Sequence, residues 1–338
     1  MASPTLPPAT DVAAPPHYRP WWLEQWLLLR RAARELAAND PLRLGAATAF
    51  FTSFALPPIL IILVQLLSSV YSTSWARMML LSKLGQLIGT TATAMVAQTV
   101  VNVANAGRNR LITVLGFCFL VFVATTLFTI IQHSLNQLWH VRPRRQVSQV
   151  KVALHERLRS GGVLLATAAL SVLAFTTDAA LDFFADLISD FDANFAYYAV
   201  RVLNEVMSLL ILVTWVGFVF RTLSSARVPW RAVRRGAVLT ALLIEAGEYV
   251  LDHLLVSRDL GPIYGPAASL VLVLLFVFYS AMIFYFGASY TWAYAHHVGL
   301  DIRPKKSAVR YRLVNINDVA ALPPAKDGKA GALPGPVS

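Results

Sequence analysis

The sequence predicts an all-α polytopic membrane protein with six transmembrane helices, an N-terminal interfacial helix and an outer-face helical hairpin. The first observation is a run of 29 residues, 267–295, that contains no Asp, Glu, Lys, Arg or His. A bilayer core about 30 Å thick needs about 20 apolar residues of helix, so this run is long enough to cross it. The second is composition: 57% of the 338 residues are hydrophobic and 14% are charged, against about 25% charged in ordinary soluble domains.

The third observation is the placement of Lys and Arg. Counted along the chain, 23 of the 29 basic residues fall in the N-terminal region, the linkers after the second and fourth spans, and the C-terminal tail. With six spans, these four segments lie on one side. Basic residues resist translocation, so this side is predicted to be cytoplasmic, with both termini inside. The linker between spans three and four instead carries five Asp and no Lys or Arg: Asp178, Asp182, Asp186, Asp190 and Asp192.

The elements follow in order. Residues 1–20 are rich in Pro and Ala, show no apolar core of a signal peptide, and predict a disordered cytoplasmic tail. A six-helix membrane domain is predicted over residues 21–300, followed by a basic, mostly disordered cytoplasmic tail over 301–338. The predicted spans are about 44–70, 111–139, 161–181, 195–220, 236–256 and 266–296.

Two further helical elements flank or interrupt these spans. From Trp22 to Leu36, apolar residues recur at helical spacing with arginines elsewhere on the helix, which is typical of an interfacial helix in the head-group region. Residues 71–109 form a long and weakly polar connection, and their apolar spacing predicts a helical hairpin on the outer face, partly dipping into lipid.

The first span is predicted to begin at Asp40-Pro41, because Pro is favoured at the first helical position. Pro57 and Pro58 should kink or break this span about halfway. Such a kink is either purely structural or lines a cavity, because irregular backbone at bilayer depth must be sheltered.

The fifth span carries three carboxylates, Glu245, Glu248 and Asp252, on one helical face. Glu245 follows Gly236 by nine residues, about 14 Å along the axis and so near the bilayer midplane. Three such acids cannot all be ionised in lipid. One interpretation is that they line a polar cavity that binds a cation, a proton or a polar head group. The other is that they form a buried ion pair with a basic group such as Arg201.

Polar residues in two other spans are further candidates, because ionisable groups within a membrane usually face the bundle interior. Arg201 and Glu205 in span four are spaced for an i,i+4 pair and are either functional or simply solvated helix ends. His133 and Asn136 share a face of span two. His133 either relays protons or hydrogen-bonds between helices. Cys118 lies in an apolar run and is predicted to be a buried structural thiol.

Four segments in order resemble the YihY/BrkB family of bacterial inner-membrane proteins. They are ATAFFTSFALPPILIIL in span one, LNQLWHVRPRR closing span two, RRGAVLTALLIEAGEYV opening span five, and IYGPAASLVLVLLFVFYSAMIFYFGA. Tyr264-Gly265 and Gly287-Ala288 match the family's YG and GA landmarks. The chain departs from the pattern at Ser289, where members often have an acid, and at Pro266, where they often have Ser. The resemblance covers roughly residues 25–297.

The resemblance implies a six-helix protein of the cell envelope in the bacterial inner membrane. Members of this family are variously labelled ribonuclease BN-like, linked to serum resistance, or proposed to move lipids. The residues favour a transporter or a lipid or amphiphile translocator, with spans one, two, four and five enclosing a polar cavity lined by Glu245 and Glu248. The alternative is a non-transporting scaffold that organises other envelope proteins.

Enzymatic functions fit the sequence less well. A ribonuclease needs paired carboxylates, a metal cluster or a His-based acid–base pair on a soluble domain, and neither tail is long enough to fold one. A membrane-embedded enzyme of another kind remains an alternative. No metal-ligand or P-loop motif is found, so we expect no metal, no other cofactor and no nucleic-acid partner. The expected partners are membrane lipids, with other envelope proteins or further copies of the chain as alternatives.

Overall fold

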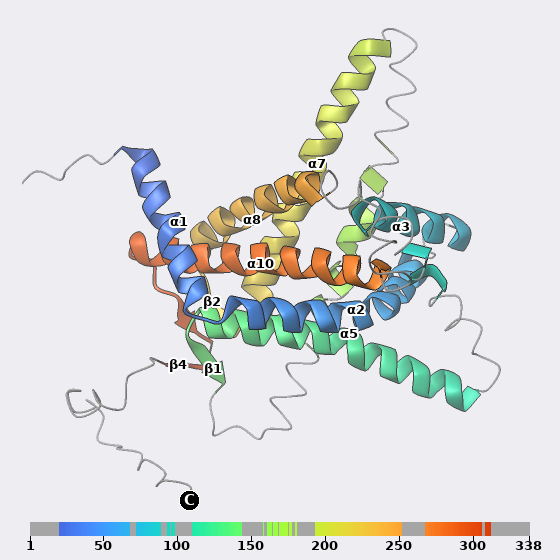
Figure 1. The fold of residues 1–338 in the computed structure, drawn as a ribbon, viewed down its shortest axis with the longest axis horizontal. Coiled ribbons are helices and arrows are strands. Elements are labelled where there is room, and N and C mark those ends of the chain that lie inside the picture. The colour runs from blue at the N-terminus through green and yellow to red at the C-terminus, as the bar shows by residue number, and fades with distance from the viewer. Residues whose placement is uncertain are drawn as a thin grey trace, which may run out of the picture.

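The computed structural model describes residues 20–67, 72–88, 93–94, 96–98, 110–143, 193–251, 268–305 and 308–311, together with helical pieces between 158 and 180. The described chain is mostly helical (Figure 1). Its helices are α1 Trp21–Ala37, α2 Pro41–Leu67, α3 Thr73–Ile88, α5 Arg110–Leu138, α7 Ala193–Leu223, α8 Trp230–Leu251 and α10 Ala268–His297.

Helices occur at each predicted span. The bounds of α2, α5, α7 and α10 differ from the predicted spans by at most three residues, whereas α8 begins six residues before the predicted start. The predicted span 161–181 is helical wherever it is described. Within the described residues, two segments, Val200–Leu223 and Val273–His297, are long and apolar enough to cross a membrane.

The central helix of the bundle is α10. It packs against α8 on one side, against α2 and α5 on the other, and against α1 near its C-terminal end, as Figure 1 shows. The main partners of α8 are α7 and α10. Because α10 packs against α8 as well as against α2 and α5, it is a shared neighbour of these spans, and the predicted cavity between spans one, two, four and five stays a prediction.

A reciprocal glycine contact holds α8 against α10. A side-chain carbon at Gly236 would clash with Thr291 Oγ1, and one at Gly287 would clash with Thr240 Oγ1. Each threonine hydroxyl also donates a hydrogen bond to the glycine carbonyl four residues before it, at 2.7 Å for Thr240 and 2.9 Å for Thr291. Small residues at matching positions let two helix backbones approach closely, a common device in membranes.

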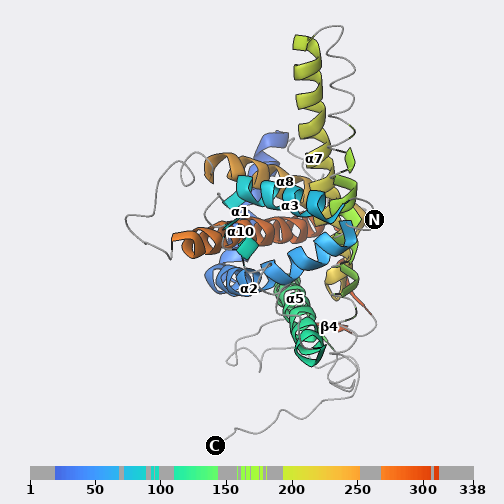
Figure 2. The ribbon, with the colours of Figure 1, turned by 90° about the vertical axis from the view of Figure 1, so that its right-hand side faces the viewer.

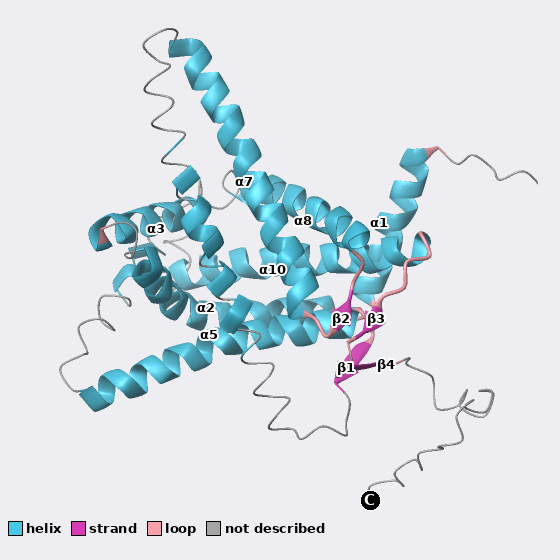
Figure 3. Cartoon of the chain, turned by 180° about the vertical axis from the view of Figure 1, so that it is seen from behind, coloured by secondary structure: helices cyan, strands magenta, loops and turns pink. Residues whose placement is uncertain are grey.

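Four short strands join the connections at one end of the bundle. Strand β1 (Val141–Pro143), after α5, pairs antiparallel with β4 (Ala308–Arg310), and β2 (Ala226–Arg227), after α7, pairs antiparallel with β3 (Arg303–Pro304). Figure 3 shows all four strands together. No strand was predicted. Residues 301–305 and 308–311, predicted as the start of a mostly disordered tail, hold both connections instead, and the side chain of Ile302 is 1% exposed.

We call this the basic end of the bundle. It comprises α1, the C-terminal ends of α5, α7 and α10, the N-terminal end of α8, and the four strands. It brings together described parts of all four segments in which the predicted cytoplasmic Lys and Arg residues lie. The count of six spans and their orientation in the membrane stay predictions.

The predicted interfacial helix is α1. It crosses α10 at the basic end (Figure 1) and buries Leu28 and Ala32 against Tyr290 and Ala293 of α10. The side chains of Trp22 and Trp26 are exposed instead, at 58% and 62%. Aromatic rings at this position suit a membrane–water boundary.

Helices α5 and α7 diverge from the bundle toward their N-termini, as Figures 1 and 2 show. Their N-terminal halves expose apolar side chains, including Phe119, Val202 and Val206. Cys118 lies on this part of α5 and is exposed. The prediction of a buried thiol is wrong, because the helix surrounding it leaves the packed part of the bundle.

The second half of α2 packs against α3, whose Ala76 and Leu80 are buried with Leu60 and Leu63. This is the first helix of the predicted hairpin, and it lies at the end opposite α1 (Figure 1). One continuous helix runs through Pro57 and Pro58, so the span is not broken. The ribbon of α2 does change direction along its length (Figures 1 and 2), which agrees with a kink.

Candidate functional site

Two of the predicted site residues lie close together. Glu205 of α7 is near enough to Glu245 of α8 for their carboxylates to repel each other. Glu245 is partly buried, while Glu205 and its neighbour Arg201 are exposed. The side chain of Glu248 and the whole of Asp252 lie outside the described residues, as do Tyr264 and Gly265.

Asn136 does not belong to this group. Its Oδ1 accepts hydrogen bonds from the Ser225 backbone N–H at 2.7 Å and the Ser224 hydroxyl at 3.0 Å. It therefore fastens α5 to the end of α7 at the basic end. Glu205 is 18 residues from the end of α7, which corresponds to about 27 Å along the axis. His133, predicted to share a polar face with Asn136, is exposed on α5.

Other residues of the LNQLWH segment, which carries Asn136, also contact distant parts of the chain. Trp139 donates its indole N–H to the carbonyl of Ala288 at 3.0 Å. The His140 ring lies between those of Trp292 and Tyr311, and its Nε2 is 3.7 Å from Glu35 Oε1. Burial raises the pKa of Tyr311, against a smaller opposing effect of Arg142, so the ring stays neutral at physiological pH. Asn136, Trp139 and His140, which belong to the segment that resembles the family, therefore pack the helices together.

A groove of about 640 Å³ lies on α8 at the basic end. One end of its wall consists of three arginines from the first two turns of α8, and the other consists of apolar residues from the following turns, with two tyrosines from α10 alongside. These residues are Arg231, Arg234, Arg235, Val238, Leu239, Leu242, Tyr290 and Tyr294. Pockets that hold small ligands typically measure about 300–1,000 Å³, so the groove is large enough for a ligand.

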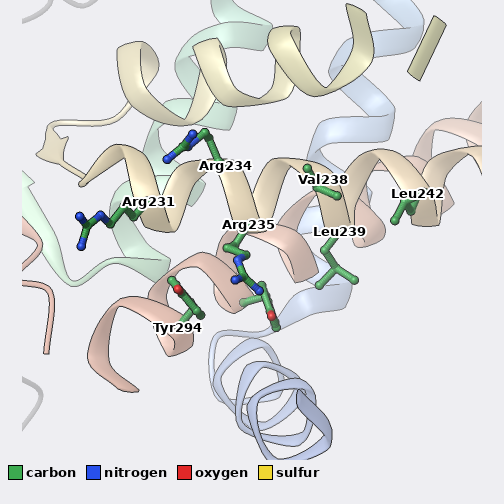
Figure 4. Close-up of a pocket in the computed structure, with 8 residues that line it drawn as sticks. Arg231, Arg234, Arg235, Val238, Leu239, Leu242 and Tyr294 are labelled. Atoms are coloured by element: carbon green, nitrogen blue, oxygen red, sulfur yellow. The ribbon is translucent and has the colours of Figure 1, made fainter. Parts of the chain in front are cut away.

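The side chains of this groove are ordered from charged to apolar along α8. Figure 4 shows Arg231 and Arg234 toward the start of the helix, Arg235 turned toward Tyr294, and the apolar side chains farther along. The Arg235 guanidinium stacks over the Tyr294 ring at 5.5 Å. Tyr290 donates a hydrogen bond to Gln25 of α1 at 2.9 Å, which ties α1 to the edge of the groove.

Beyond the groove, an exposed face of α8 continues toward Glu245. Arg231, Arg235, Val238, Leu242 and Glu245 are spaced by four, three, four and three residues, so they form one stripe along α8. The first four of these side chains are exposed and Glu245 is partly exposed. From Arg235 to Glu245 the stripe covers ten residues, about 15 Å, or half of a bilayer core. We call it the α8 stripe.

The groove was not predicted from the sequence, because its arginines also fit the positive-inside pattern and were assigned to topology. The pattern was nevertheless visible: WRAVRRG places three arginines within five residues, and Val238 and Leu242 repeat on the same face one and two turns later. No cluster of three His, Cys, Asp or Glu side chains that could hold a metal occurs within the described part of the chain.

Comparison with known proteins places these features in a family. Residues 32–312 match the family described as virulence factor BrkB. A UPF0761 membrane protein of Pseudomonas aeruginosa (strain LESB58) is 32% identical over 182 residues, which are 53% of this chain and 41% of the relative. One of Chromohalobacter salexigens is 27% identical over 280 residues, covering 80% of this chain and 65% of the relative. No solved structure matches.

The alignments span from about two fifths to two thirds of the length of these relatives. The match to the family covers most of this chain and includes the four segments that resemble it. The relatives are named as membrane proteins, and the apolar helices agree with that name. This chain is a membrane protein that belongs to the BrkB virulence factor family.

Proposed function

We propose that this protein translocates a lipid or a similar amphiphile across the bacterial inner membrane, along the outer surface of α8. The chain crosses the membrane six times, and the basic end faces the cytoplasm. The positive-inside rule supports this orientation, because the predicted cytoplasmic segments meet at the basic end.

The observation that carries the proposal is the α8 stripe. It starts at an arginine-lined groove at the basic end and leads along an exposed, mostly apolar helix face to Glu245. A polar head group moving across a bilayer needs polar partners at intervals, while its acyl chains can stay in the lipid. The arginines and the carboxylates of Glu245 and Glu205 supply such partners at the surface and about 15 Å deeper.

This route differs from the cavity expected from sequence. The described basic half of the bundle is filled by buried side chains such as Trp139, Phe220 and Tyr285. A path along the outside of α8 requires no passage through that core. We expect no catalytic step, and the driving force to be an ion gradient or mass action.

Reconstitution in liposomes tests this function. Wild-type protein should accelerate the exchange of head-group-labelled phospholipid between leaflets. Glu245→Gln should return the rate to that of protein-free liposomes, because the amide removes the charge that the route requires at mid-depth. Asp40→Asn, a charge-neutralising change at an exposed position, is the matched control and should retain the wild-type rate. Exchange at the wild-type rate in a correctly inserted Glu245→Gln protein would contradict the proposal.

A scaffold that holds other envelope proteins is the second candidate. The packed core of the basic half favours it, because a rigid bundle needs no internal path. A scaffold should tolerate Glu245→Gln and should show no lipid exchange in the wild type. The same liposome measurement therefore separates the two functions.

A further inference from the structure

The three arginines of the groove have no acidic or hydrogen-bonding side-chain partner among the described residues. No ion pair or side-chain hydrogen bond of Arg231, Arg234 or Arg235 occurs with any described residue; the Arg235 guanidinium stacks on Tyr294. Arg231 is three residues from Arg234 and four from Arg235, spacings at which like charges on a helix destabilise it. An anion bound between them would relieve this repulsion.

The chemistry of the guanidinium group limits which kinds of anion could bind here. Its planar fork matches the oxygens of phosphate and carboxylate in a bidentate way. Three guanidinium groups within two turns offer more donors than a single carboxylate can use. A phosphate, with its larger set of acceptor oxygens, uses them better.

The remaining wall indicates that the phosphate carries an apolar tail. Val238 is 43% exposed and Leu242 is 49% exposed, directly beyond the arginines along α8. Leu242 lies seven residues past Arg235, about 10 Å farther along the axis. Tyr290 and Tyr294 line the side of the groove, and such rings are typical of the level where head groups meet acyl chains.

We infer that this groove binds an anionic glycerophospholipid from the adjacent leaflet, with its phosphate on the three arginines and the start of an acyl chain along Val238 and Leu242. The orientation rests on the proposed function, and the inference deepens it by naming the ligand class. Basic pockets between membrane helices on the cytoplasmic side are known to hold anionic lipid head groups. A second copy of the chain is a poorer occupant, because its own basic end would bring further positive charge.

Lipid binding to the purified full chain in detergent tests the site. Phosphatidylglycerol and phosphatidylethanolamine are titrated separately, and the lipid retained per protein is measured by native mass spectrometry. The wild type should retain phosphatidylglycerol in preference to phosphatidylethanolamine. The triple variant Arg231→Gln, Arg234→Gln, Arg235→Gln should bind phosphatidylglycerol weaker by a factor on the order of 100.

The control removes the same charge elsewhere at the basic end. Arg30→Gln, Arg34→Gln and Arg227→Gln change three exposed arginines that do not line the groove, and this protein should keep the wild-type preference. Equal losses in both triple variants would mean that only the overall charge attracts lipid, which overturns the site. Equal retention of both lipids by the wild type would overturn it as well.

A charge-neutral variant tests the same groove if the triple variant does not fold. Val238→Trp fills the apolar wall and leaves all three arginines in place, so phosphatidylglycerol binding should fall. Unchanged binding would contradict the placement of the acyl chain. Inorganic phosphate should displace the lipid only weakly, and displacement at concentrations similar to the lipid's own would show a site for free phosphate instead. A change in oligomeric state with no change in lipid retention would assign the groove to a contact between copies.

Measuring lipid binding and lipid exchange together distinguishes the proposed lipid site from the proposed transport function. Loss of phosphatidylglycerol binding in the triple variant, with no lipid exchange by the wild type, would leave the site standing and refute the proposed function. Continued exchange by a triple variant that still binds phosphatidylglycerol as the wild type does would refute only the site.

Discussion

Glycine at positions 236 and 287 decides how close α8 and α10 approach each other. Each faces a threonine of the other helix, and the two threonines bond back to their own helices. Gly287 belongs to the GA pair that the family resemblance singled out, and Gly236 belongs to the segment that opens span five. The landmark residues were therefore visible in the sequence, but their pairing was not, because it joins helices about 50 residues apart.

Gly236→Ala is expected to destabilise the protein. Its new methyl group would clash with Thr291, and overpacking of this kind typically costs about 1–3 kcal/mol. Thermal unfolding of the purified protein in detergent should show a lower melting temperature than the wild type.

The matched control is Gly162→Ala, where an added carbon meets nothing within 4 Å. Alanine favours helix over glycine, so this variant should be at least as stable as the wild type. A Gly236→Ala protein that melts at the wild-type temperature would show that α8 and α10 are not held by this contact.

An individual helix could be predicted from the sequence where the length of its apolar run is enough to identify it. A run of apolar residues long enough for a bilayer predicts a helix with bounds correct to a few residues, as for α2, α5, α7 and α10. The start of α8 at Trp230 was missed because Arg231, Arg234 and Arg235 make its first two turns look like a loop. The strands of two or three residues were missed because they depend on pairing between distant segments, which leaves no local pattern.

The segment after α10 is expected to stabilise the basic end. A chain truncated after Leu300 loses β3, β4 and the buried side chain of Ile302. Burial of Ile302 alone is worth about 1.5–3 kcal/mol. The melting temperature in detergent should therefore fall clearly below that of the full chain.

Truncation after Tyr311 is the control for this experiment. It keeps both strand pairs and removes only residues 312–338, which the sequence predicts to be disordered. The melting temperature should match that of the full chain. If the two truncated proteins were equally stable, the strands would contribute nothing to the fold.

The arrangement of the whole molecule was only partly predictable. The positions of Lys and Arg predicted that the four basic segments lie on one side of the membrane. The described parts of these segments do meet at one end of the bundle. The central position of α10 was not predictable, because a helix that is apolar all round shows no preferred face. The sequence also grouped Asn136 with Glu245, although Asn136 bonds at the basic end and Glu245 lies about four turns farther along α8 from the start of that helix.

The orientation of the bundle in the membrane is the claim on which both proposals depend. It is tested by labelling single cysteines in intact cells with a membrane-impermeant thiol reagent, in a Cys118→Ser background. Asp186→Cys lies in the acidic linker and should be labelled from outside. Arg145→Cys lies in the basic linker after α5 and should be labelled only after the cells are opened. Labelling of both positions, or of Arg145→Cys alone, in intact cells would contradict the six-span topology and the cytoplasmic basic end.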